Sequence, residues 1–390
     1  MRRIALAGKP NAGKSTFFSA ATMSDVEMAN YPFTTIDPNR GVAHARTRCP
    51  CTDRDADCGI CREGARYVPV ELVDIAGLVP GAHTGRGLGN QFLDALTTAE
   101  AIVTVIDAAG ATTAEGEPVA VGTTDPLEEV AFIEDELEAW MAQIIADNWA
   151  GVRRSARAPG FDLDGALADV LSGLGITDHV ITAVLREAEY PTQVDAWGDG
   201  EFTMLAAAVR QRAKPIVVCA NKVDIAPAET VAALEDETEA VMTAAIAERT
   251  LRRGVDAGVL DYRPGDDSFR VTQDLDVQQR AGLDAIAELL TRYGSTGVQA
   301  TIDRAVYDRL ELITVYPVQN ETRWTDAGGQ MLPDALLLPA GSTPRDLAYA
   351  VHSDIGDGYL HAVDARTQRR IGDATTLEEG AVIKIVSTAD

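Results

Sequence analysis

A glycine-rich segment near the N-terminus has the residue types and the spacing that bind phosphate groups. It reads GKPNAGKST over residues 8–16, between a short apolar run at residues 4–7 and a stretch from Phe17 that predicts a helix. Its glycines allow backbone N–H groups to turn toward phosphate oxygens, Lys14 can reach the β- and γ-phosphates, and Ser15 can bind Mg²⁺. This order of strand, glycine loop and helix predicts a nucleotide site. The residues expected to bind the nucleotide there are Asn11, Ala12, Gly13, Lys14, Ser15 and Thr16.

Two later segments place polar residues directly after apolar strands. Residues 70–73 are followed by Asp74, whose carboxylate can hold Mg²⁺ through water, and Gly77 allows a backbone N–H to approach the γ-phosphate. Residues 216–220 are followed by NKVD, in which Asp224 can accept two hydrogen bonds from the N1–H and the amine of guanine. Adenine lacks this pair of donors, so the sequence predicts a guanine nucleotide. The residues expected to read the base are Asn221, Lys222 and Asp224.

The elements that must position these groups predict an α/β fold. Each motif ends an apolar strand, which is typical of a P-loop NTPase G domain with a mostly parallel sheet and helices on both faces. Apolar residues recur at helical spacing after residue 111, and strand patterns with one capped helix fill the C-terminal part. We expect a G domain at residues 1–110 and 205–300, a helical insertion at residues 111–204 and a β-grasp domain at residues 305–390.

Together these motifs resemble one family of nucleotide-binding proteins. The chain is similar over nearly its whole length to the Obg family of TRAFAC-class GTPases, in the archaeal type of its YchF-like branch. Residues 29–39 resemble the switch I of that branch, residues 74–82 and 85–93 resemble its switch II, and the C-terminal part looks like a TGS domain. The resemblance implies that Thr35 binds Mg²⁺ when a triphosphate is present, with Thr34 as the neighbouring alternative. The residues then expected to act in catalysis are Lys14, Thr35 and Gly77.

The resemblance also implies an activity, and alternatives to it stay open. It implies hydrolysis of GTP to GDP and phosphate by a conformational switch linked to ribosomes, RNA and translation. One alternative is an ATPase, because some relatives in the YchF branch have a changed base-reading motif and prefer ATP. The other is a module that binds RNA or a ribosome and holds its nucleotide with negligible turnover. The TGS-like part would carry the RNA contact, and a basic cluster at Arg366, Arg369 and Arg370 would meet phosphate or form a solvated turn.

The position after the switch II glycine is unusual for a GTPase. Leu78 has no polar group, whereas many GTPases carry a glutamine there that positions the attacking water. The water must then be positioned by backbone groups of switch II, a cation or a partner protein, and His83 is a weak candidate. Thr104 stands where bacterial members of the branch often carry a histidine. Asn11 occupies the loop position that holds K⁺ in several related GTPases, so we expect K⁺ to stimulate hydrolysis.

The loop expected to support the guanine base departs from the pattern of related proteins. It is assigned to residues 241–245, where the usual Ser-Ala pair is replaced by Ala244 and Ala245. The side-chain contact of the serine is therefore lost. The backbone N–H of Ala245 is expected to bond the guanine O6.

Four of the five cysteines cluster within 13 residues. Cys49, Cys51, Cys58 and Cys61 have the spacing C-x-C-x₆-C-x₂-C on a polar loop, which is typical of a small zinc knuckle. A redox-sensitive pair and incidental thiols remain as alternatives. In a reducing compartment a metal is favoured over disulfides.

The acidic composition indicates adaptation to a high-salt solvent rather than a particular binding partner. The net charge is −26 with an isoelectric point near 4.5, and the lysines are Lys9, Lys14, Lys214, Lys222 and Lys384. This acidic, lysine-poor chain resembles proteins of halophilic archaea, whose surfaces are screened at high salt. We see neither a signal peptide nor an apolar stretch near 18 residues, and therefore expect a cytoplasmic protein with no membrane and no DNA partner.

Overall fold

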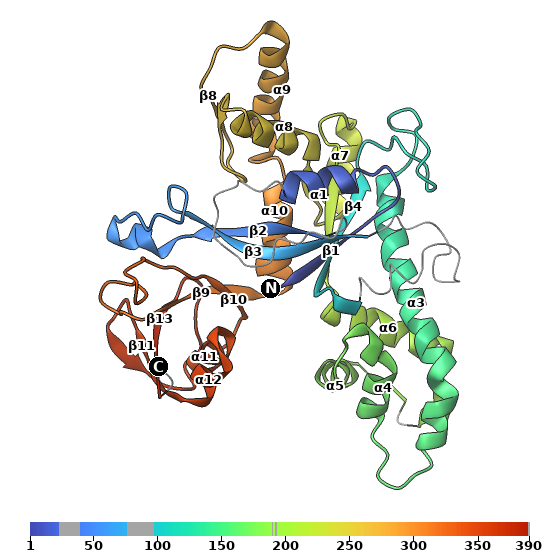
Figure 1. The fold of residues 1–390 in the computed structure, drawn as a ribbon. Coiled ribbons are helices and arrows are strands. Elements are labelled where there is room, and N and C mark those ends of the chain that lie inside the picture. Colours follow the sequence, from blue (N-terminus) through green and yellow to red (C-terminus); the bar gives the residue numbers. More distant parts are fainter. Residues whose placement is uncertain (23–39, 76–96, 189, 192, 389–390) are drawn as a thin grey trace.

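The protein is built around a six-stranded sheet whose strand ends carry the nucleotide motifs (Figure 1). The computed structural model describes residues 1–22, 40–75, 97–188, 190–191 and 193–388. Strand order is β2-β3-β1-β4-β5-β6, and all neighbours pair in parallel except β2 with β3. The strands are β1 (Arg3–Ala7), β2 (Arg40–Arg48), β3 (Ala65–Asp74), β4 (Ala101–Asp107), β5 (Ile216–Asn221) and β6 (Val241–Thr243). The predicted fold class, with a mostly parallel sheet, is thus confirmed.

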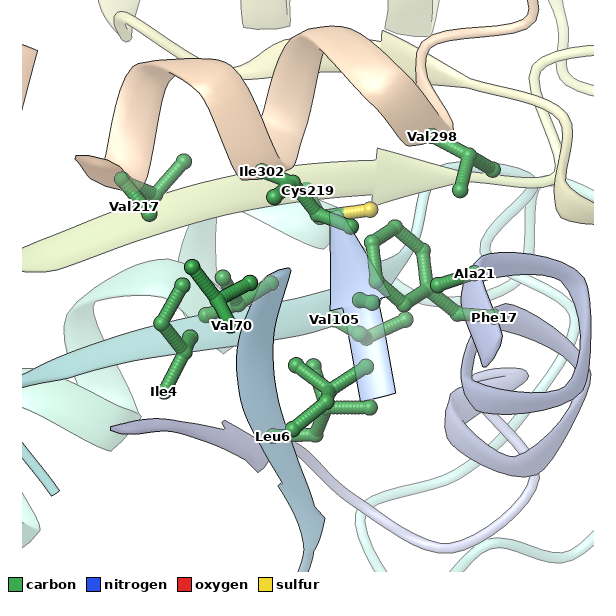
Figure 2. Packing of buried hydrophobic residues seen from close by; sticks show 14 of the residues in the cluster. Ile4, Leu6, Phe17, Ala21, Val70, Val105, Val217, Cys219, Val298 and Ile302 are labelled. Atoms are coloured by element: carbon green, nitrogen blue, oxygen red, sulfur yellow. The ribbon is translucent and has the colours of Figure 1, made fainter. Parts of the chain in front are cut away.

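One face of this sheet is covered by helices from opposite ends of the chain. They are α1 (Lys14–Thr22), the short α10 (Val298–Asp303) and the π-helical turn η5 (Arg304–Arg309). Figure 2 shows Phe17 of α1 and Ile302 of α10 packed over the strand residues Ile4, Val70 and Val217. Cys219 lies fully buried in the same cluster, as expected of a core residue. Covering by helices on both faces explains why these strands read as continuous apolar runs.

The other face carries a helical insertion. Its first helix, α3 (Pro126–Ser155), starts at Asp125, whose side chain accepts a hydrogen bond from the Leu127 N–H. A separate core forms between α3 and the three following helices, around Trp149, which stacks on Trp197 at 5.1 Å between ring centroids. The following helices are α4 (Leu163–Leu171), α5 (Asp178–Glu187) and α6 (Asp199–Ala213), with short 3₁₀ turns η3 (Ser172–Leu174) and η4 (Val194–Ala196).

Residues 222–297 add three further helices and a small sheet around the central sheet. α7 (Ala228–Glu237) and α9 (Val277–Tyr293) contribute to the core on the α3 side, and α8 (Ala245–Asp256) follows β6 directly. A two-stranded sheet of β7 (Leu260–Asp261) and β8 (Arg270–Val271) connects α8 to α9.

The C-terminal residues form a second sheet with two helices. Its order is β10-β9-β13-β11-β12, in which only β9 and β13 are parallel. Thr343 caps the first helix together with Asp346, as its sequence predicts. The elements are β9 (Leu312–Val318), β10 (Leu336–Pro339), α11 (Pro344–Val351), α12 (Ser353–Asp357), β11 (Tyr359–Asp364), β12 (Arg369–Ile371) and β13 (Val382–Ser387).

A long hairpin joins the two sheets. β2 and β3 extend beyond the other strands of the central sheet toward the C-terminal module, and their connection contains the 3₁₀ turn η1 (Pro50–Arg54) (Figure 1). Arg366 of the C-terminal module forms an ion pair with Asp53 of this turn. Arg366 therefore has a carboxylate partner in the protein itself, whereas the sequence suggested either a phosphate contact or a solvated turn.

The packing places two domain limits differently from the sequence-based expectation. The limit expected at residue 204 falls inside α6, whose Phe202, Leu205 and Val209 all lie in the core of the insertion. The limit expected at residue 300 falls inside α10, which packs on the central sheet together with η5. We therefore propose that the insertion continues to Ala213 and the G domain to Arg309.

Some predicted features lie outside the described residues. They are Thr34, Thr35, Gly77, Leu78, His83 and the switch segments except for Asp74 and Ile75. Among the residues that the structure describes, no helix has the length and apolar character needed to cross a membrane.

Candidate nucleotide site

The phosphate loop connects β1 to α1 in a backbone form that requires glycine. Gly8 has a φ of +136° and Gly13 a φ of +103°. A Cβ at Gly8 would lie 2.2 Å from the Val105 carbonyl oxygen, and one at Gly13 would lie 2.1 Å from Nδ2 of Asn221. Any larger side chain would displace the loop from its neighbours.

Lys14 lies at the first position of α1, and its ammonium group is held by the loop itself. Nζ donates to the carbonyl oxygens of Gly8 and Lys9, both at 2.9 Å. Burial lowers the pKa of Lys14, and the nearby Asp74 and Glu129 carboxylates oppose that shift. The site therefore contains a partly desolvated cation whose present partners are neutral carbonyls, which favours an anionic ligand.

Ser15 and Asp74 supply oxygen atoms suited to a divalent cation. The Ser15 hydroxyl donates to Oδ2 of Asp74 at 3.4 Å, although the two residues are 59 positions apart. Oδ1 of Asp74 is buried and has no hydrogen-bond partner among the residues that the structure describes. Burial also raises the pKa of Asp74, against the effects of Lys14 and Ser15. A hydroxyl beside a carboxylate with an unsatisfied buried oxygen fits Mg²⁺, which prefers oxygen ligands.

Asn221 joins the phosphate loop to the base-reading region. Its Nδ2 donates to the Ala12 carbonyl at 3.0 Å, and its Oδ1 accepts from the Ala245 N–H at 3.1 Å. One buried side chain thus fixes the spacing between the loop after β1 and the start of α8.

Lys222 and Asp224 differ in how they are held. Lys222 has a φ of +68°, and its Nζ bonds Oδ2 of the fully buried Asp107 at 2.8 Å. Asp224 is exposed, and partial desolvation still raises its pKa. A cavity of about 480 Å³ opens beside Asp224, between α8 and α9. Asp224 is therefore placed to accept hydrogen bonds from a ligand.

The amide expected to bond the guanine O6 is already engaged in the structure. The Ala245 N–H donates to Asn221, and the Ala244 N–H donates to the Thr296 carbonyl. The next amide, that of Ile246, has no partner among the described residues, and Ile246 borders the cavity beside Asp224. The expected bond from the Ala245 N–H to the guanine O6 would therefore require Ala245 to leave Asn221, whereas the Ile246 N–H is available without such a change.

Two contacts between the phosphate loop and the insertion could not be foreseen from sequence patterns. Lys9 forms an ion pair of 2.8 Å with Glu129 of α3, and each side chain is only 6% exposed. Nδ2 of Asn11 donates to the Gly116 carbonyl at 2.8 Å, in the segment before α3. Only the helical periodicity of α3 was visible in the sequence, because its rotation relative to the loop depends on packing.

The four cysteines that the sequence suggests as zinc ligands come together at the end of the β2–β3 hairpin. Their four sulfur atoms lie within 4.8 Å of one another. None of these cysteines contacts the nucleotide residues described above. Their chemistry is considered separately below.

A mostly parallel sheet that carries a phosphate loop, a serine–aspartate pair and a base-reading loop at its strand ends defines a P-loop nucleotide-binding protein. Three family models match the chain: one described as "50S ribosome-binding GTPase" over residues 3–141, one described as "Obg-like GTPase YGR210-like, G4 motif-containing domain" over residues 219–320, and one for the TGS domain over residues 329–387. The predicted G domain and TGS domain are thereby confirmed.

Several relatives share most or all of the chain. A GTP-binding protein of Methanocaldococcus jannaschii is 41% identical over 100% of both chains, and one of Schizosaccharomyces pombe is 33% identical over 89% of each. The crystal structure of a GTP-binding protein from Pyrococcus horikoshii is 35% identical, covers 100% of both chains and has a TM-score of 0.79. The chain therefore belongs to the YchF-type Obg-like GTPase family.

Two further relatives are more distant: one is named an ATPase, and the other has low sequence identity. Obg-like ATPase 1 of Danio rerio is 31% identical over 56% of this chain and 52% of its own. The structure of the Schizosaccharomyces pombe YchF GTPase shares the fold, with a TM-score of 0.57 at 20% identity over 99% of this chain and 97% of that one.

Proposed function

We propose that this protein binds GTP with Mg²⁺ and hydrolyses it to GDP and phosphate, as a conformational switch. The observation that carries this proposal is the arrangement of Lys14, Ser15 and Asp74, which Asn221 connects to the base-reading loop. Lys14 would leave its carbonyl partners for the β- and γ-phosphates. Thr35 and Gly77, taken from the family resemblance, would complete the γ-phosphate contacts and act with Lys14 in catalysis. Binding and release of the γ-phosphate would order and free the two switches.

Mg²⁺ would bind through Ser15 and Thr35 directly and through Asp74 by way of water. When bound, the ion neutralises charge that develops on the phosphate oxygens. Asp74 suits this role because its Oδ2 already contacts Ser15 and its Oδ1 lacks a partner within the described part of the chain.

We expect replacement of Ser15 by alanine to raise the Mg²⁺ concentration needed for half-maximal GTP hydrolysis by about 10–100-fold. The variant lacks one oxygen ligand, while Asp74 remains. Titration of GTPase activity with MgCl₂ measures the effect. Ser19, one turn further along α1, is the matched control, and Ser19→Ala should leave the titration unchanged. Equal Mg²⁺ dependence of Ser15→Ala and the wild type would exclude Ser15 as a ligand.

Base recognition would combine a carboxylate and a backbone amide. Asp224 would accept from N1–H and the amine of guanine, and the Ile246 N–H would donate to O6 in place of the engaged Ala245 amide. Lys222 would stay on Asp107 and hold the loop in its left-handed turn. This pattern favours GTP over ATP, although the name Obg-like ATPase 1 describes relatives that match part of the chain.

K⁺ is the second cation that we propose for the site. The Nδ2 group of Asn11 donates to the Gly116 carbonyl, which leaves its Oδ1 as the amide atom that would bind a cation. A monovalent cation at Oδ1 would stabilise transition-state charge between the phosphates, in place of the glutamine that Leu78 replaces.

We expect GTP hydrolysis in KCl to exceed that in NaCl at equal ionic strength by about tenfold or more, and Asn11→Ala to remove the difference. Phosphate release, measured in both salts, tests this. Asn148→Ala is the control, because Asn148 lies on the exposed side of α3 and its side chain bonds the Ile144 carbonyl of the same helix. Equal rates in the two salts would contradict the proposed role of K⁺.

We propose a ribosome or RNA partner for the C-terminal module and a cytoplasmic location. The TGS domain and the description "50S ribosome-binding GTPase" of the matching family model support the partner. A chain that binds GTP and ribosomal RNA without turnover in either salt would instead favour the binding-module alternative. The high acidic charge further supports a high-salt interior as the protein's medium.

A further inference from the structure

The four clustered cysteines have the dimensions of a metal site. Their sulfur atoms all lie within 4.8 Å of one another, with 3.8 Å between Cys49 and Cys58 and 3.4 Å between Cys51 and Cys61. A tetrahedral zinc ion with Zn–S bonds of about 2.3 Å requires sulfur atoms about 3.8 Å apart. All four side chains are free thiols. The set therefore needs little adjustment to enclose one ion.

The backbone around the cluster directs N–H groups at the sulfur atoms. The Cys61 N–H donates to Sγ of Cys58 at 3.3 Å, across a tight turn in which Gly59 has a φ of +70°. The Cys49 N–H donates to the Gly64 carbonyl at 2.7 Å and closes the base of the loop. N–H donors at sulfur stabilise thiolate, the form that binds metal.

The cluster is enclosed by apolar residues from both sheets. Cys49, Cys51 and Cys58 are each at most 3% exposed. The apolar residues that surround them are Val68, Tyr316, Val318, Trp324, Leu332, Ala335, Ala365 and Val382, of which all except Val68 belong to the C-terminal module. Cys61 is partly exposed. Four protein sulfurs fill a tetrahedral site and leave no open coordination position, which is typical of a structural zinc.

We propose that Cys49, Cys51, Cys58 and Cys61 bind one structural Zn²⁺, which fixes the tip of the β2–β3 hairpin against the C-terminal module. Three contacts across this junction depend on the shape of the tip. Nε2 of Gln330 donates to the Cys58 carbonyl at 2.6 Å, and Arg54 donates to the Thr322 carbonyl at 2.6 Å. The Arg54 guanidinium also lies 3.9 Å from the ring centre of Trp324. Cross-linking by zinc would hold these partners in place.

Metal content of the full-length protein, purified in reductant, tests the zinc site without reference to nucleotide turnover. We expect about one zinc per chain by mass spectrometry. The double variant Cys58→Ala with Cys61→Ala should lose it. Cys219→Ala, at the core cysteine outside the cluster, should keep it. Cys58→His should also keep it, because Cys₃His is a common zinc set, and this variant guards against a general folding failure.

Several outcomes would overturn the assignment. They are iron in place of zinc, zinc retained by the double variant, two disulfides in the metal-free protein, or no metal bound after zinc is added to the reduced chain. Hydrogen exchange of amides in residues 320–332, which contact the hairpin tip, tests whether zinc fixes the tip against the C-terminal module. We expect exchange there to rise by at least about tenfold in the double variant and to remain unchanged in Cys219→Ala. If the wild type binds zinc and the zinc-free double variant shows unchanged exchange in this segment, zinc does not fix the hairpin against the C-terminal module.

Discussion

Replacing Lys14 with methionine is expected to lower the rate of GTP hydrolysis by about 10²–10³-fold or more without destabilising the folded protein. The ammonium group is desolvated, and its present partners are the carbonyls of Gly8 and Lys9. We therefore expect the ammonium group to interact favourably with the phosphates of bound GTP, and more strongly in the transition state than in the ground state. Single-turnover GTP hydrolysis and chemical denaturation, both in the same KCl buffer, measure the two parts of this prediction.

The neighbouring Lys9 provides a matched comparison for the effect on stability. Lys9→Met would leave Glu129 buried without its cation, because the two side chains pair at 2.8 Å and are nearly inaccessible. Loss of one partner of a buried ion pair costs about 3–5 kcal/mol. We therefore expect Lys9→Met to unfold at lower denaturant concentration than both Lys14→Met and the wild type. Near-normal turnover by Lys14→Met would remove the basis of the proposed catalytic site.

Replacing Asp224 with asparagine is expected to weaken GTP binding by roughly 10²–10⁴-fold and to improve binding of XTP. The carboxylate would accept two hydrogen bonds from guanine, and each bond to a charged group is worth about 1.5–3 kcal/mol. Xanthine has a carbonyl where guanine has its amine, so the asparagine N–H can donate to it. Equilibrium titration with GTP, XTP and ATP measures the change in preference.

Glu229 offers the control for that experiment. It is an exposed acid in the first turn of α7, so Glu229→Gln removes the same charge nearby and should leave the nucleotide preference unchanged. If Asp224→Asn still prefers GTP over ATP and XTP, the base is read by other groups. A wild-type protein that prefers ATP would lead to the same conclusion.

The parts of the site that the sequence predicted best are encoded locally. The phosphate loop needs its glycines and Lys14 within a few residues, so its strand–loop–helix context was visible without knowledge of the fold. The cysteine cluster was visible for the same reason, because all four sulfurs come from one hairpin connection. The proximity of Ser15 and Asp74 also followed, since strands β1 and β3 are adjacent and parallel.

Features that depend on how distant elements pack could not be predicted in this way. Glu129 was one acid among many on a helical pattern, and only the orientation of α3 brings it to Lys9. The engaged amide of Ala245 depends on the orientation of the Asn221 side chain, which spacing does not specify. Arg366 read as part of a free basic cluster, because its partner Asp53 is 313 residues away in the chain.

The covering of the central sheet by α10 and η5 has a consequence for the nascent chain. Val298, Ile302, Ala305 and Val306 bury apolar residues of strands that are made hundreds of residues earlier. Domains otherwise tend to fold from the N-terminus as synthesis proceeds. Here one apolar face of the central sheet stays partly uncovered until the chain has been synthesised as far as Arg309. A chain arrested before Val298 would therefore contain every nucleotide motif and still expose an apolar sheet face that is prone to aggregate unless chaperones bind it.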